Sequence, residues 1–270
     1  MKSFTMKALA VAVLGLAGTG SAFALCPTIS AASATPGGGG AWSSQTVTAA
    51  TFGNAATGLN GTSCALSVSI NNGAASNTKG FVTDLSPANE THYRARFYFN
   101  IAGLTGLTQA NRQARIFSAL ATTAPAGAGA EELIVNLVGG GTPSIRFVIG
   151  DTTVAGSTQK IVSASLPTAT TAGNYRVEFD LNSTAGTFRY WVLDAAQDNT
   201  TFNDSNSAAL TNASGTYGST TITDTGWSGV KQVNLGLFGT STQFRQANQV
   251  TGQPLIVDEF DSRRATFIGQ

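Results

Sequence analysis

The sequence is poor in the residues that most often carry chemistry. It has one histidine, His92, and two cysteines, Cys26 and Cys64. With no third soft ligand, the chain argues against a zinc-type metal centre. Charged residues make up only 11% of the chain, with 15 basic and 14 acidic side chains. This near-neutral balance gives no dense basic footprint for nucleic acid.

The chain also lacks a long apolar run after its first residues. Lys2 and Lys7 flank the start of the apolar stretch 8–18, and the small-x-small motif "AFA" follows at 22–24. This pattern predicts a secretory signal peptide, residues 1–24, cleaved near Ala24. The apolar stretch is shorter than the ~20 residues that span a bilayer, so we expect a secreted or periplasmic protein with no transmembrane segment.

Export bears on the two cysteines. In an oxidising compartment an isolated pair most often forms a disulfide, so we expect Cys26 to be bonded to Cys64. In the chain-entropy model such a bond contributes ~3–4 kcal/mol. Lipidation of Cys26 is the alternative, but Leu25 stands where lipoprotein processing favours a small residue.

Thr, Ser, Gly and Ala dominate the rest, and the helix formers Lys and Glu are scarce. Apolar and polar residues alternate in clear runs, which predict half-buried strands of antiparallel sheets. These runs are "THYRARFYFNI" (91–101), "ELIVNLVG" (132–139), "SIRFVIG" (144–150), "NYRVEFDL" (174–181), "TFRYWVL" (187–193) and "KQVNLGLFG" (231–239). "NSTAG" (182–186) joins two of them and predicts a hairpin. We expect a flexible lead-in over 25–45, one domain over 46–270 and a long surface excursion over 195–226.

The succession "YRARFYFNIAGL", "ELIVNLVGGGTPSIRFVI", "GNYRVEFDLNSTAGTFRYWVLD" and "VDEFDSRRATFIG" resembles bacterial laminin-G-like domains of the concanavalin A-like superfamily. The resemblance covers roughly residues 42–268. It implies an all-β fold, an antiparallel β-sandwich (jelly roll) of two stacked sheets. The superfamily includes lectins, adhesion modules and glycan-cleaving enzymes, so the fold leaves function open.

The glucanases of that superfamily carry Glu-x-Asp-x-Glu on one strand, because retaining hydrolysis needs two carboxylates ~5–5.5 Å apart. Glu178 and Asp180 match the first two positions, but Asn182 stands at the third. Glu259 and Asp261 also match, with an arginine at the third position. No Gly-x-Ser-x-Gly elbow appears, and we expect His92 to be solvated or paired across strands. The sequence therefore predicts a protein that is not an enzyme.

Asp258 alternates with Ile256 and Phe260, so we expect it to point inward between two apolar side chains. A buried carboxylate needs compensation, either by arginine or by a structural Ca²⁺ ion. Beyond this option on Asp258, the sequence implies no cofactor.

The polar faces of the strongest strands suggest where a ligand would bind: Arg94, Arg96, Tyr98, Arg176, Arg189 and Trp191. Aromatic rings stack on sugars and arginines bind carboxylates or sulfates, whereas an outer face laced with ion pairs is the alternative. We expect an exported, non-catalytic domain that binds a carbohydrate or cell-surface polymer. A structural or adhesive component of the cell surface is the second hypothesis, and a laminarinase-type hydrolase the third.

Overall fold

The structure is a computed structural model. It describes residues 42–55, 58–59, 65–70, 74–85, 87–167, 173–195, 215–247 and 254–263. All statements below concern these residues. Among them, no helix has both the length and the apolarity to cross a membrane.

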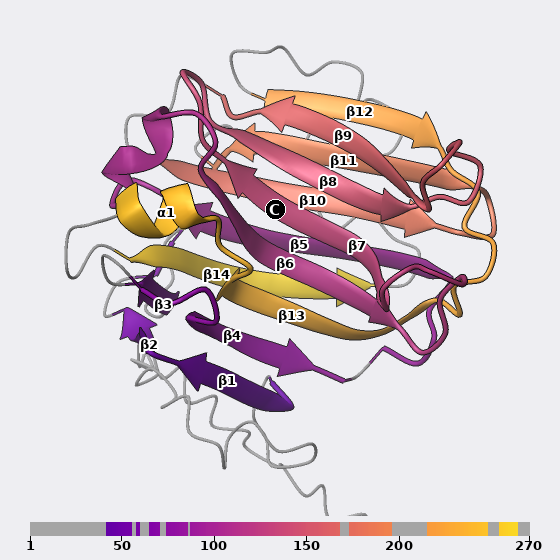
Figure 1. Cartoon of the computed structure of the whole chain (residues 1–270), viewed down its shortest axis with the longest axis horizontal. Coiled ribbons are helices and arrows are strands. Elements are labelled where there is room, and N and C mark those ends of the chain that lie inside the picture. Colours follow the sequence, from indigo (N-terminus) through magenta and orange to yellow (C-terminus); the bar gives the residue numbers. More distant parts are fainter. Residues whose placement is uncertain are drawn as a thin grey trace, which may run out of the picture.

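Two antiparallel sheets of seven strands each make up the fold, stacked face to face (Figure 1). The first sheet has the order β1 (Ser44–Thr48), β4 (Lys79–Asp84), β13 (Val230–Phe238), β6 (Gln113–Ala121), β7 (Glu131–Val138), β8 (Ser144–Gly150) and β9 (Gln159–Ser165). The second has the order β12 (Gly215–Thr221), β11 (Thr187–Asp194), β10 (Asn174–Asn182), β5 (His92–Asn100), β14 (Leu255–Arg263), β3 (Ala65–Ile70) and β2 (Ala50–Ala55). The expected all-β jelly-roll sandwich is confirmed.

Only two short helical segments are described, the 3₁₀ turn η1 (Thr105–Thr108) and α1 (Thr242–Ala247). Both lie at one end of the sandwich (Figure 1). Neither described helical segment covers a sheet face, and each sheet buries one face against the other.

Aromatic rings from both sheets fill the space between them. Phe117 of the first sheet lies 5.9 Å from Phe97 and 5.1 Å from Phe179 of the second, measured between ring centroids. Phe147 lies 5.3 Å from Phe188 in the same way. A buried Phe costs ~3–5 kcal/mol when cut back to Ala, so this ring cluster makes a large contribution to the stability of the sandwich.

The alternating runs form strands within a residue or two of the expected bounds. The "NSTAG" hairpin is also confirmed: Asn182 Oδ1 accepts a hydrogen bond from the backbone N–H of Ala185 at 2.8 Å, and Gly186 has a φ of 64°. The first strand starts at Ser44, inside the expected lead-in, and Trp42 already packs on Phe260 with ring centroids 5.0 Å apart.

The expected surface excursion over 195–226 is described only from residue 215, where β12 begins. Residues 196–214 lie outside the described residues, as do the signal-peptide range and both cysteines. The signal peptide and the disulfide therefore stay predictions.

Candidate active site

Three neighbouring strands, β11, β10 and β5, carry charged side chains on the face that points away from the core. On β5, Tyr93, Ala95, Phe97 and Phe99 belong to the core, so the residues between them point outward. The same alternation on β10 and β11 brings together all the ligand-site residues expected from the sequence: Arg94, Arg96, Tyr98, Arg176, Arg189 and Trp191.

Cross-strand register places opposite charges side by side on this face. Asp180 lies between Arg94 on β5 and Arg189 on β11. Glu178 pairs in the same way with Arg96 on β5. Opposite charges directly across an antiparallel pair stabilise it, so this register is favoured by the sequence itself.

This face is not the open arginine-rich surface that the sequence suggested. Arg94, Arg176, Tyr98 and Trp191 are fully buried, and Arg96 is 8% exposed. The sequence left two possibilities open, a ligand-binding face and a face laced with ion pairs, and this burial agrees with the second. Alternation shows which side chains share a face, but not whether another part of the chain covers it. Arg189 differs from the others, with 26% of its side chain exposed.

Asp180 holds this cluster together. Its Oδ2 accepts hydrogen bonds from Arg94 Nη2 at 2.5 Å and from Arg189 Nη2, and its Oδ1 lies 2.8 Å from His92 Nε2. Burial alone would raise the pKa of Asp180, but the hydrogen bonds and positive charges of Arg94 and Arg189 outweigh it and hold the pKa below its ordinary value. Asp180 is therefore ionised at neutral pH.

His92 stands at the accessible edge of the cluster, with 28% of its side chain exposed. An ionised carboxylate only accepts hydrogen bonds, so Nε2 of His92 carries the hydrogen that points to Asp180. This fixes the tautomer and leaves the lone pair on Nδ1, which makes no hydrogen bond to a described residue. A histidine oriented by a carboxylate in this way is arranged as a general base.

Trp191 is buried against the two arginines that bind Asp180. The guanidinium groups of Arg94 and Arg189 lie 5.5 Å and 5.7 Å from its ring centroid, and Tyr217 of β12 packs on it with ring centroids 5.5 Å apart. Cation–π contacts of this kind are worth ~2 kcal/mol or more when desolvated. The two arginines are therefore held in place from both the Asp180 side and the Trp191 side.

Glu178 is also committed to an ion pair. Its Oε2 accepts a hydrogen bond from Arg176 Nη2 at 2.8 Å, and both side chains are fully buried. Together with the arginine-bound Asp180, this removes both carboxylates from the role of proton donor to a glycosidic oxygen. The structure thus adds a physical reason against a laminarinase-type hydrolase to the missing third carboxylate.

Asp258 differs from its expected position. β14 has a bulge between Asp258 and Asp261, with Glu259 at a φ of 47°. The extra residue reverses the alternation, so Phe260 packs against the core while Asp258 lies on the opposite face with Ile256. Asp258 accepts backbone N–H hydrogen bonds from Leu59 at 2.7 Å and from Glu259 at 2.8 Å.

Backbone donors thus compensate at least part of the Asp258 charge, a route that the sequence analysis did not weigh against arginine and calcium. Within the described ranges, no three His, Cys, Asp or Glu side chains cluster closely enough to hold a metal ion.

The expectation that His92 is solvated or paired across strands agrees with its contact with Asp180, whereas the sequence did not indicate the central place of Asp180 in this cluster. A signal was present: His92 and Arg94 alternate on one strand, and Asp180 alternates with Glu178 and Arg176 on another. Pairing those strands with antiparallel register brings the histidine to the carboxylate.

Comparison with known proteins bears on what such a site does. No protein-family model matches the chain, and no curated protein matches its sequence. Among solved structures, the endo-β-1,4-glucuronan lyase of the fungus Trichoderma reesei matches with a TM-score of 0.50 and 14% sequence identity. The match covers 81% of this chain and 88% of the lyase chain. At this identity the likeness shows a shared fold.

This comparison corrects two expectations from the sequence, that the protein is not an enzyme and that it is a non-catalytic binding or adhesive domain. Both depended mainly on the missing carboxylate of one hydrolase motif, and also on the absent Gly-x-Ser-x-Gly elbow. The matched structure is an enzyme of another reaction class on the same sandwich, a lyase. Absence of the hydrolase motif therefore does not argue against catalysis on this fold.

Proposed function

We propose that this protein is an exported enzyme that cleaves uronate-containing polysaccharides by β-elimination, within the concanavalin A-like superfamily. The observation that carries the proposal is the partly exposed His92, oriented by Asp180 beside Arg189, on a fold shared with a glucuronan lyase. The partner is an acidic glycan.

Elimination from a uronate requires a base and a nearby positive charge. The proton on C5 is next to the carboxyl group, and a cation that binds this carboxylate makes the proton easier to remove. Arg189 is the partly exposed arginine beside His92, and it is anchored by Asp180 and Trp191. We assign it to the substrate carboxylate.

The proton balance closes with one histidine. Nδ1 of His92 takes the C5 proton, the electron pair of that bond forms the C4–C5 double bond, and the bond from C4 to the glycosidic oxygen breaks. In a β-1,4-linked glucuronate the C5 proton and the leaving oxygen lie on the same ring face. The imidazolium can therefore return its proton to the departing oxygen, and ionised Asp180 stabilises the imidazolium between these steps.

The test is a continuous ultraviolet assay for the unsaturated uronate product, with polyglucuronate, alginate and pectate as substrates. We expect turnover on at least one of them. His92→Ala should lower kcat by about 10²–10⁴-fold, the usual contribution of a general base. Asp180 acts through His92 and is a positioning residue. Asp180→Asn would also leave the buried Arg94 without its carboxylate and impair folding, so His92→Ala carries the kinetic test.

Lys231→Gln is the matched control, since it removes one charge from an exposed position on the other sheet. It should leave kcat and KM unchanged. The proposal is wrong if no uronate polymer gives an unsaturated product, or if His92→Ala retains full activity while its melting curve matches that of the parent protein.

A further inference from the structure

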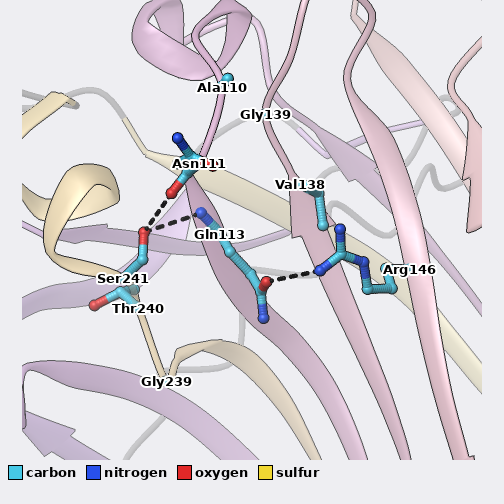
Figure 2. Close-up of a pocket in the computed structure, with 9 residues that line it drawn as sticks. All are labelled: Ala110, Asn111, Gln113, Val138, Gly139, Arg146, Gly239, Thr240 and Ser241. Carbon is cyan, nitrogen blue, oxygen red and sulfur yellow. Dashed lines mark hydrogen bonds between the residues drawn. The ribbon is translucent and has the colours of Figure 1, made fainter. Parts of the chain in front are cut away.

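A polar hollow lies on the opposite side of the sandwich, on the outer face of the first sheet. Its volume is about 540 Å³, within the range of small-ligand sites. The start of β6, the ends of β7 and β13 and the strand β8 surround it (Figure 2). Its lining residues are Ala110, Asn111, Gln113, Val138, Gly139, Arg146, Gly239, Thr240 and Ser241.

Arg146 provides the only charge in this lining. Its Nη1 donates a hydrogen bond to Gln113 Oε1 at 3.2 Å, which fixes both side chains (Figure 2). Because Gln113 uses its oxygen for this bond, its Nε2 amide group remains a donor without a partner among the described residues. Arg146 has no carboxylate partner there either. A guanidinium beside an amide donor is a carboxylate-binding arrangement.

The wall of the hollow is rigid. Ser241 Oγ donates to the backbone oxygen of Asn111 at 3.2 Å and accepts from the backbone N–H of Gln113 at 3.1 Å (Figure 2). This hydroxyl ties the segment after β13 to the start of β6. Binding here would therefore cost little ordering of the protein.

A second hollow of about 340 Å³ adjoins the first and shares Gly239 with it. Two aromatic rings lie in its lining, Phe81 and Phe238, with centroids 5.0 Å apart. Lys79 lies 5.9 Å from the Phe81 ring centroid and has no carboxylate partner among the described residues. The single acid in this lining, Glu131, is already paired with Arg115.

We propose that the two hollows are consecutive subsites of an acidic-saccharide binding surface, separate from the candidate active site. In the first, Arg146 and Gln113 Nε2 bind a sugar carboxylate. In the second, the partly exposed ring of Phe81, backed by the buried Phe238, supports the apolar face of a neighbouring sugar, with Lys79 beside it. Arg146 and Lys79 have no carboxylate partner among the described residues, and the acid in the lining, Glu131, is paired with Arg115. This excess of positive charge favours a polyanionic chain. This proposal does not rest on the lyase activity.

Isothermal titration calorimetry with the full chain carrying His92→Ala, which prevents turnover, tests the surface. The probe is a β-1,4-linked glucuronate tetrasaccharide, with cellotetraose as the neutral analogue and sodium sulfate as the small anion. We expect the acidic tetrasaccharide to bind, cellotetraose to bind at least tenfold more weakly, and sulfate to compete only weakly.

Arg146→Gln, added to His92→Ala, should weaken the Kd of this surface roughly ten- to a hundredfold, as expected for losing a charge-assisted pair. The matched control Lys231→Gln removes the same charge at the other end of β13 and should change the Kd less than about twofold. Equal binding by the Arg146→Gln and Lys231→Gln proteins would overturn the proposal, as would equal binding of the neutral tetrasaccharide.

If sulfate binds as tightly as the acidic tetrasaccharide, the hollow is a general anion site and the saccharide assignment is wrong. Failure here is distinguishable from failure of the proposed function. Loss of binding in Arg146→Gln would support the proposed surface even if the wild type cleaved no polymer. If Arg146→Gln binds the tetrasaccharide as well as its parent protein, the proposed surface is wrong even if the wild type cleaves a uronate polymer.

Discussion

We predict that Glu132 on β7 makes the stability of this protein sensitive to alkaline pH. Its side chain is fully buried and meets the carboxyl group of Asp224 in the loop before β13. Ser183 Oγ from the β10–β11 hairpin also donates to Glu132 Oε1 at 3.4 Å. Burial, and then the hydrogen bond and negative charge of Asp224, raise the pKa of Glu132 to about 10 from its ordinary 4.5. At neutral pH Glu132 is protonated in the folded chain.

The sign of the pH effect follows from this raised pKa. Above about pH 4.5 the unfolded chain releases the Glu132 proton, whereas the folded chain keeps it up to about pH 10. The free energy of unfolding is therefore undiminished by Glu132 below the pKa of this group in the unfolded chain, and it falls as the pH rises toward the pKa in the folded chain. The loss is at most about 1.4 kcal/mol per pH unit, and at most about 5 kcal/mol between about pH 5 and about pH 9.

Glu132→Gln removes this titration while keeping the shape and a hydrogen-bond donor for Asp224. We expect its free energy of unfolding, from urea titrations at several pH values, to match the wild type near pH 4.5 and to exceed it increasingly toward pH 9. Glu131→Gln, one residue away but 29% exposed and paired with Arg115, is the control and should leave the alkaline slope unchanged. Parallel pH profiles for wild type and Glu132→Gln would refute the reasoning.

Two further predictions concern stability, and a third concerns the two cysteines. Asp258→Ala should lower the free energy of unfolding by ~1–3 kcal/mol because two backbone N–H groups lose a charged acceptor. A chelator should not change the melting temperature of the wild type, and a large fall with the chelator would instead indicate bound calcium. Gly236→Ala should cost ~2 kcal/mol or more by urea unfolding, since its φ is 149° and a Cβ would lie 2.4 Å from a carbonyl oxygen of β4; an unchanged midpoint would contradict this. Thiol titration of the unfolded, unreduced protein should find neither Cys26 nor Cys64 free, and two titratable thiols would disprove the disulfide.

The sequence predicts the strands in which one face is uniformly apolar. β5 and β10 are examples, with every second residue aromatic, aliphatic or alanine. It does not single out β6, "QARIFSALA", because bulges between Arg115 and Phe117 and between Ala119 and Leu120 interrupt the two-residue period. Ile116 and Phe117 are consecutive in the chain, yet both belong to the core. A pattern rule that assumes a regular strand cannot find such an element.

The same limit explains the error at Asp258. The sequence places Ile256, Asp258 and Phe260 on one face, as a regular strand would. Glu259 instead adopts a left-handed φ, and the residues after it exchange faces. A glutamate gives no local signal for that conformation, which is usually associated with glycine or asparagine.

For the candidate site, the sequence correctly assigns side chains to one face but gives no measure of their burial. Polar residues that alternate with apolar ones look the same whether they face water or form a second, charged layer. The balance of charges is the better indicator: Asp180 and Glu178 stand opposite Arg94 and Arg96, so their charges compensate without solvent. Burial of such a layer costs several kcal/mol per ion unless every charge is paired, and this register provides the partners.

On the outer face of the second sheet, substitutions of different residues should have different effects on stability and activity. On the second sheet, buried arginines such as Arg94 and Arg176 hold carboxylates, so replacing either one should leave a buried charge uncompensated and impair folding before it impairs catalysis. His92 is partly exposed and its partner Asp180 keeps two other donors, so its removal leaves the ion pairs in place. We expect a substitution of His92 to reduce activity without reducing stability, and a substitution of Arg94 to reduce stability. This contrast is expected when a structural layer of charges positions a single catalytic group.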